Sequence, residues 1–193
     1  KKVGEAMTHQ FVLVLDFGGQ YNQLIARRVR ECGVYCEVHP YSTPLEKIKE
    51  MNPIGIIFTG GPNSVYDENS PKVDPAIFEM GVPILGLCYG GSVKSAPNKE
   101  FGKTETRFNN QSKVFGNLPE SGITWMSHND YVDAMPTGFT SVAQTDDCPV
   151  AAMENAERKI YCFQYHPEVN HTENGIKMIR NFLFEVCGAK GDW

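Results

Sequence analysis

A cysteine set between two glycines is the residue in this sequence best suited to chemistry. Residues 82–91 read VPILGLCYGG, in which apolar residues typical of a short buried strand lead directly to Cys88. Gly86 and Gly90 lie two residues to either side, and this G-x-C-x-G spacing is that of a nucleophile elbow, a sharp strand-to-helix turn that exposes the reactive atom. A buried cysteine that only packs in the core fits the same residues. The pattern alone therefore leaves both interpretations open.

A second group of catalytic residue types stands near the other end of the chain, in the stretch QYHPE. On a strand, His166 and Glu168 would share one face because they are two residues apart, and Pro167 would end the hydrogen-bonded ladder. With Cys88, this pair would supply a nucleophile, a base and an orienting carboxylate. A surface ion pair is the alternative. A metal site that adds His171 lacks the helical H-E-x-x-H spacing.

Composition limits the class of protein. The 193 residues are 41% hydrophobic, which predicts one domain with a full-sized core, and the net charge of −5 without any basic run argues against a nucleic-acid partner. The longest apolar runs are too short to span a membrane, and no signal peptide is visible. Six cysteines without C-x-x-C pairs indicate a reduced, cytoplasmic protein, and no metal-ligand spacing stands out.

Strand-like and helix-like patterns alternate in the first half of the chain. We expect strands over 11–15, 34–38, 54–58 and 82–87, and helices over 20–32, 44–51 and 75–80. This alternation predicts an α/β fold, with an open, mostly parallel central sheet and helices on both faces. Ligands of such sheets bind beyond the carboxyl ends of the strands, where Gly18, Gly60, Gly61 and Cys88 all fall.

The second half changes character. Short strands, expected to be antiparallel and appended to the sheet, are predicted over 104–108, 123–126, 140–144, 150–155 and 159–165. A closing amphipathic helix over 172–187 would turn Ile176, Ile179, Leu183 and Val186 inward. Residues 1–10 are expected to be a disordered leader or a cloning remnant, and 11–193 a single domain.

Several longer motifs together resemble the class I (triad) glutamine amidotransferases, and within them the GMP synthetase branch. The resemblance covers the chain from residue 11 to residue 193 and rests on motifs at five places. They read DFGGQY from Asp16, TGGPNSVY from Thr59, GLCYG from Gly86, WMSHND from Trp125 and HPEVNHT from His166. Sister amidotransferases for anthranilate or carbamoyl phosphate tend to read N-G-P-G, C-L-G and H-P-E-S at the corresponding places.

The resemblance implies a catalytic mechanism. Cys88 would attack the side-chain amide of glutamine, His166 would carry the proton to the leaving ammonia, and Glu168 would orient the imidazole. Backbone N–H groups of Gly61 and Tyr89 would form the oxyanion hole. The thioester on Cys88 would then be hydrolysed to glutamate.

The resemblance also implies the binding residues and the partner. Gly60 and the run Ser127, His128, Asn129 and Asp130 would hold glutamine. Ammonia would pass to an ATP-pyrophosphatase domain or subunit that aminates XMP to GMP, and nothing resembling that part is present in this sequence. No cofactor is implied in the amidotransferase domain itself. ATP and Mg²⁺ belong to the synthetase partner, and neither a nucleic acid nor a membrane is implied.

The sequence departs from the family after the elbow. The family continues with a Met-Gln pair and a full helix, whereas here Gly90 is followed by GSVKSAP, whose glycine and proline leave no room for that helix. Either about ten residues of the molecule are missing from this sequence, or the helix is deleted and the domain inactive. Deleting a central helix would open a large core cavity, so we favour the first explanation and expect a break in the chain at Gly90–Gly91.

Other functions fit parts of the same pattern. An amidotransferase fold without activity could serve only to dock on a partner, which the missing helix favours and the retained Cys88, His166 and Glu168 oppose. A cysteine peptidase or γ-glutamyl hydrolase could use the same three residues on peptide or folate conjugates. A metal-dependent hydrolase built on His166, Glu168 and His171 is the weakest alternative.

Overall fold

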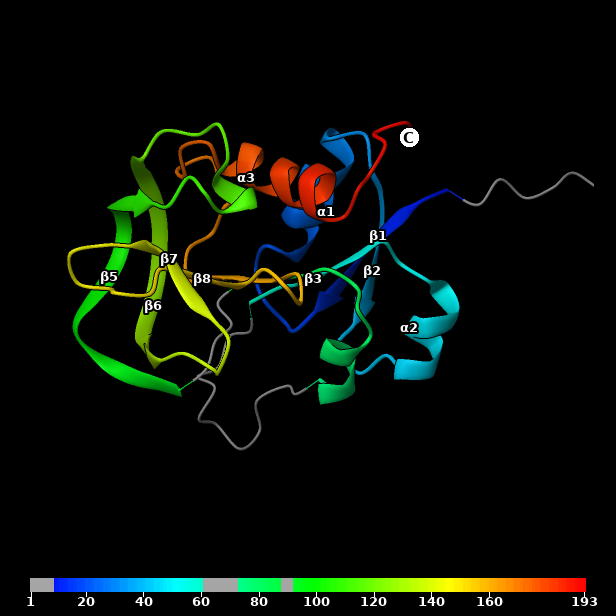
Figure 1. Cartoon of the computed structure of the whole chain (residues 1–193), viewed down its shortest axis with the longest axis horizontal. Coiled ribbons are helices and arrows are strands. Elements are labelled where there is room, and N and C mark those ends of the chain that lie inside the picture. The colour runs from blue at the N-terminus through cyan, green and yellow to red at the C-terminus, as the bar shows by residue number, and fades with distance from the viewer. Residues whose placement is uncertain (1–8, 61–72, 88–91) are drawn as a thin grey trace, which may run out of the picture.

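A single mixed sheet of nine strands forms the centre of the molecule (Figure 1). The computed structural model describes residues 9–60, 73–87 and 92–193, without the side chains of 92–100, 128–131 and 133. The strand order is β2-β1-β3-β4-β9-β8-β7-β5-β6. Ladders among β2, β1, β3, β4 and β9 are parallel, and the remaining ladders are antiparallel. The predicted α/β class with an appended antiparallel part is confirmed.

The parallel strands inside the sheet are short and mostly apolar, as expected for strands that are covered on both faces, whereas the edge strand β2 carries Glu37 and His39 and is mostly only partly buried. Their bounds are β1 Phe11–Asp16, β2 Tyr35–Pro40, β3 Gly55–Phe58, β4 Ile84–Leu87 and β9 Ile160–Phe163. The antiparallel strands are β5 Ser92–Phe108, β6 Ser121–Ala134, β7 Thr140–Gln144 and β8 Ala152–Asn155.

Helices cover both faces of the parallel part, and the core is accordingly divided in two (Figure 1). The helices are α1 Asn22–Glu31, α2 Leu45–Met51, α3 Gly175–Asn181, a π-helical turn Phe182–Val186, and 3-10 helices Pro75–Glu79 and Lys113–Phe115. Along β1, Val12 and Val14 pack in the core beneath α1 and α3, whereas Leu13 and Leu15 pack in the core on the side of α2. In the described part of the chain, no helix is long and apolar enough to cross a membrane.

The hairpin of β5 and β6 is much longer than the sequence pattern predicted. Residues 104–108 and 123–126 were expected to be strands, but β5 begins at Ser92 and β6 continues to Ala134. The extra residues of β5 include Pro97, Asn98 and Gly102, which are typical of turns. Gly102 pairs with Met126 of β6, whereas Pro97 and Asn98 fall in the interval between Ser95 and Glu100, where the register shifts and no pairs form.

The closing helix differs from its prediction in two respects. It begins at Gly175 and not at residue 172, and a Cβ at Gly175 would overlap the carbonyl of Pro167, so glycine is required at this position. Its last turn is π-helical, with Cys187 N bonded to Phe182 O at 2.9 Å. The prediction that Ile176 faces inward is wrong, since its side chain is 42% exposed, whereas Ile179 and Leu183 are buried.

The contact between β3 and the end of this last helix generates a stability prediction. A Cβ at Gly55 would overlap Cys187 Sγ, and Phe182 lies close behind it. Gly55→Ala should therefore lower the free energy of unfolding by about 1–3 kcal/mol through overpacking, measured by urea denaturation. Gly55→Ala combined with Cys187→Ala should recover most of that loss. An equal loss in the single and double variants would show that the Cys187 sulfur is not the obstacle.

Candidate active site

The imidazole of His166 and the carboxylate of Glu168 are in direct contact. His166 Nδ1 lies 2.8 Å from Glu168 Oε1, and the side chains of the two residues are 12% and 1% exposed. A carboxylate on Nδ1 fixes the tautomer and the ring plane, so that Nε2 carries the basic lone pair. The arrangement is that of a general base with its orienting carboxylate, and it excludes the alternative of a surface ion pair.

The two residues meet in a turn and not along a strand, which corrects the expectation that they share one face of a strand. Strand β9 ends at Phe163, and an isolated bridge joins Tyr165 to Met126. His166 follows that bridge, and Pro167 and Glu168 form a turn. Because Pro167 lacks an N–H, the chain leaves the ladder here, and the turn folds the carboxylate back onto the ring.

Strand β6 and Thr172 hold the backbone of His166. His166 N donates to Trp125 O at 3.1 Å, while Thr172 Oγ1 accepts from Trp125 N at 2.9 Å and donates to His166 O at 2.6 Å. Thr172 is buried, so these bonds are protected from water. The sequence motifs contained Trp125 and Thr172, but spacing gave no signal of this role, because the contacts join separate segments.

An aromatic ring lies against the imidazole, and one oxygen of the carboxylate is buried without a partner in the described part of the chain. The ring of Tyr21 meets the imidazole edge-on, with centroids 5.2 Å apart. Glu168 Oε2 is buried and has no hydrogen-bond partner among the described residues. A carboxylate with one partnered oxygen gains most from an adjacent imidazolium, because burial has removed the water that would otherwise stabilise its charge.

The strand register relates the pair to the predicted nucleophile. Cys88 lies outside the described residues, but it is bonded to Leu87, the last residue of β4. In the parallel ladder of β4 and β9, Leu87 pairs with Phe163, three residues before His166. The segments that lead to Cys88 and to His166 therefore leave the sheet at the carboxyl ends of two adjacent strands, where ligands of open α/β sheets bind.

The first two glycine-rich loops meet at the same edge. Phe17 N donates to the buried Thr59 Oγ1 at 3.1 Å, and a Cβ at Gly19 would overlap the carbonyl of Gly60. Only a bare backbone permits this approach. It brings the predicted binding residue Gly60 to the first loop. The predicted oxyanion donors, Gly61 and Tyr89, and the expected break at Gly90–Gly91 lie outside the described residues.

The predicted binding run from Ser127 to Asp130 belongs to β6 and does not form a strand-end turn. Ser127 is exposed and pairs with Phe101 of β5. It lies two residues beyond Trp125, whose carbonyl accepts from His166, so the structure brings the start of this run close to the base. The side chains of His128, Asn129 and Asp130 lie outside the described part.

The described residues give no support to a metal site. Among them, no group of three His, Cys, Asp or Glu side chains could hold a metal ion. The ring of His171 lies against that of Trp125, with centroids 4.7 Å apart and the planes tilted by 31°.

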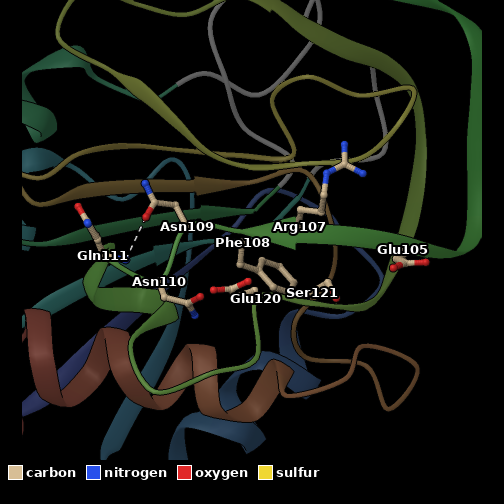
Figure 2. A pocket seen from close by; sticks show the side chains of 8 residues that line it. All are labelled: Glu105, Arg107, Phe108, Asn109, Asn110, Gln111, Glu120 and Ser121. Atoms are coloured by element: carbon tan, nitrogen blue, oxygen red, sulfur yellow. Dashed lines mark hydrogen bonds between the residues drawn. The ribbon is translucent and has the colours of Figure 1, made fainter.

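A polar pocket of about 550 Å³ lies apart from these residues, where β5 ends and β6 begins (Figure 2). Its lining includes Arg107, Asn110 and Glu120, and none of the predicted site residues. The amide of Asn110 donates to the carbonyls of Phe115 and Leu118, so it serves the folding of the loop.

The thiols generate a prediction about reactivity. At neutral pH, a diazo- or chloroketone analogue of glutamine should label Cys88 much faster than any other cysteine, as peptide mapping by mass spectrometry would show. The thiolate is the reactive form, and burial raises the pKa of Cys32, Cys36 and Cys187, and raises that of Cys162 to about 12. Equal labelling of Cys162, or rapid labelling that survives in Cys88→Ala, would remove the case for Cys88.

Thr172 generates a second prediction. Thr172→Val keeps the shape of the side chain but leaves Trp125 N and His166 O without their buried partner, so the free energy of unfolding should fall by about 1–3 kcal/mol and turnover of glutamine should fall with it. Thr172→Ser keeps the hydroxyl and should retain most of both. Calorimetry and a glutamate-release assay check the pair, and similar behaviour of the two variants would contradict the role of the hydroxyl.

The comparisons with known proteins come to the same family. The model of the glutamine amidotransferase class-I family matches residues 13–186. GMP synthases (glutamine-hydrolysing) from Caldicellulosiruptor saccharolyticus and Clostridium botulinum are 61% and 58% identical over 97% of this chain. The chain spans 38% of the length of these relatives. The first alignment runs over 196 positions, more than the 193 residues of the chain, so several positions of that relative have no counterpart here.

Solved structures agree. A protein from Thermoplasma acidophilum described as one subunit of a GMP synthase is 29% identical with a TM-score of 0.78, over 93% of this chain and 94% of that one. A glutamine amidotransferase from Thermotoga maritima, 17% identical, has the same fold with a TM-score of 0.71, over 94% of this chain and 99% of that one. With its motifs, its sheet and the His166–Glu168 pair all in agreement, the chain belongs to the class I glutamine amidotransferase family.

Proposed function

We propose that this chain hydrolyses glutamine to glutamate and ammonia through a thioester on Cys88. The observation that supports this most directly is the 2.8 Å contact between His166 Nδ1 and Glu168 Oε1. It lies just beyond β9, the neighbour of the strand that leads to Cys88. Acyl transfer through a cysteine requires a base that is oriented in this way beside the thiol.

In the first half of the proposed reaction, Cys88 Sγ attacks the side-chain carbonyl carbon of glutamine. His166 takes the thiol proton and, as an imidazolium, is stabilised by Glu168. Backbone N–H groups of Gly61 and Tyr89 stabilise the oxyanion, each contributing about 2.7–4 kcal/mol in comparable sites. His166 then gives the proton to the nitrogen, the C–N bond breaks, and ammonia leaves a thioester.

In the second half, His166 removes a proton from water, and the resulting hydroxide attacks the thioester carbon. The C–S bond breaks, the proton returns to sulfur, and glutamate is released. Substrate contacts in this proposal come from Gly60 and from Ser127, His128, Asn129 and Asp130. Their support is the position of Ser127 and Gly60 at the edge of the sheet where the base lies.

The ammonia would be consumed by a synthetase part that this sequence does not contain. The curated relatives are named GMP synthase, and the chain spans 38% of their length. We infer an ATP-pyrophosphatase domain or subunit that aminates XMP to GMP, with ATP and Mg²⁺ bound there. The reducing cytoplasm is part of this proposal, because the attacking thiol must stay reduced.

The unequal chemistry of the three residues predicts unequal losses. Cys88→Ala and His166→Ala should each abolish release of glutamate from glutamine. Glu168→Ala should keep about 10- to 100-fold more activity than His166→Ala, since the carboxylate orients and stabilises the base but forms no bond to substrate. Coupled glutamate detection measures all three.

Two comparisons separate the proposal from its alternatives. In the intact protein with its synthetase part, Cys88→Ala should lose GMP formation from glutamine but keep it from added ammonia. If the wild-type protein releases no more glutamate than Cys88→Ala, the chain is not a glutaminase, and the interpretation as an inactive domain that docks on a partner remains. Faster hydrolysis of γ-glutamyl peptides or folate conjugates than of glutamine would favour a γ-glutamyl hydrolase.

A further inference from the structure

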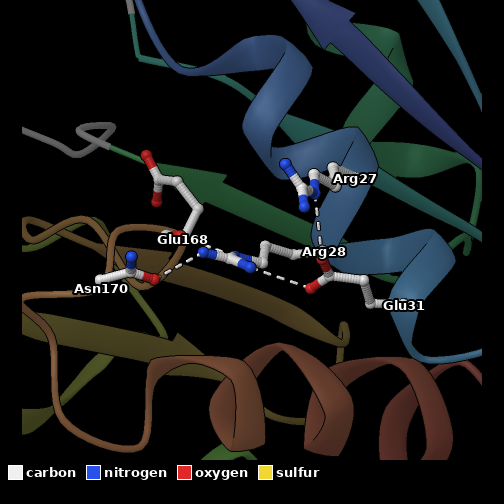
Figure 3. A network of polar contacts seen from close by, with 5 residues as sticks. All are labelled: Arg27, Arg28, Glu31, Glu168 and Asn170. Carbon is white, nitrogen blue, oxygen red and sulfur yellow. Dashed lines mark hydrogen bonds and ion pairs between the residues drawn. The ribbon is translucent and has the colours of Figure 1, made fainter.

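Arg28 of α1 connects that helix to the turn that carries the triad carboxylate (Figure 3). Its Nε donates to the carbonyl oxygen of Glu168 at 2.9 Å, and one terminal nitrogen donates to Asn170 Oδ1 at 2.8 Å. The other terminal nitrogen lies 2.9 Å from Glu31 Oε2 on the same helix. The Arg28 side chain is only 12% exposed, and its bond to the Glu168 carbonyl is partly buried, whereas the bonds to Asn170 and Glu31 are exposed.

The neighbouring arginine shows what an ordinary surface position looks like here. Arg27 is 73% exposed and pairs with Glu31 Oε1 at 3.1 Å (Figure 3). The two arginines thus share one carboxylate, but the structure gives only Arg28 a contact with the turn. The planar guanidinium of Arg28 can donate to the Glu168 carbonyl, the Asn170 amide and the Glu31 carboxylate at the same time.

The position of the Glu168 carboxylate depends strongly on its backbone. Oε1 contacts His166, while the buried Oε2 has no partner among the described residues that could fix the group from its other side. The turn lies past the end of β9, where ladder hydrogen bonds no longer hold it. The bond from Arg28 to the carbonyl of Glu168 therefore restrains the residue at a point where the sheet does not.

We propose that Arg28 is a positioning residue for glutamine hydrolysis, acting through Glu168 to hold the carboxylate against His166. This inference rests on the proposed function. A carboxylate displaced by a fraction of an ångström would orient the imidazole poorly, and misplacement on that scale costs rate more than affinity. Arg28 contacts the carbonyl of Glu168, and in the described part of the chain it contacts none of the predicted glutamine-binding residues, so kcat should fall and KM should stay.

The test uses the intact protein and a glutamate-release assay. Arg28→Met keeps the apolar stem and removes the donors; kcat should fall about 10- to 100-fold with KM changed less than about twofold. Arg28→Lys keeps the charge but cannot serve three acceptors, and should resemble Arg28→Met. Arg27→Ala, the matched control, should stay within about twofold of wild type. Thermal unfolding of each variant confirms a folded protein, and Arg28→Gln replaces Arg28→Met if the latter does not fold.

A double-mutant cycle distinguishes positioning from a general structural effect. In a Glu168→Ala background, Arg28→Met should cause no further loss of kcat, because the carboxylate that Arg28 positions is gone. An additional loss as large as in the wild-type background would overturn the proposal, as would an unchanged kcat in Arg28→Met. Wild-type protein no more active than Cys88→Ala would overturn the proposed function as well, so the two failures are distinguishable.

Discussion

The contact between the His166 imidazole and the buried Glu168 carboxylate is the interaction on which the site depends. Burying a carboxylate is costly unless a partner compensates, and here the imidazole is the partner of one oxygen. The pair lies past the end of β9, and of its two residues only His166 is held by a strand, through its bond to Trp125 of β6. Side chains from two other parts of the chain hold it: Thr172 fixes the backbone of His166, and Arg28 that of Glu168.

The sheet supplies the rest of the arrangement. Because β4 and β9 are parallel neighbours, their carboxyl ends lie side by side. The segment after β4 leads to Cys88, and the segment after β9 leads to His166. The long hairpin of β5 and β6 then brings Trp125 against the backbone of His166. The parallel part of the sheet thus positions the catalytic residues, and the antiparallel part holds the backbone of His166 in place.

The described geometry favours acyl transfer over the other functions that fit the sequence. An ion pair on the surface would be exposed, whereas Glu168 is 1% exposed. A metal site would need His171 beside the pair, but its ring lies against that of Trp125, and the described part of the chain holds no cluster of metal-ligating side chains. Retention of an oriented, buried base is also difficult to explain in a domain that only docks, since such a domain gains nothing from a buried polar pair.

The sequence by itself determined the fold class, the family and the identity of the candidate catalytic residues, because apolar periodicity and short motifs such as GLCYG and HPE are local properties. The sequence pattern wrongly placed His166 and Glu168 along a strand, although they meet in a turn, and wrongly turned Ile176 inward. It also predicted much shorter strands than β5 and β6. The tertiary structure alone decided that Arg28 meets Glu168 from 140 residues away and that Thr172 joins Trp125 across 47. Such contacts depend on how strands and helices pack, and spacing along the chain carries no trace of that packing.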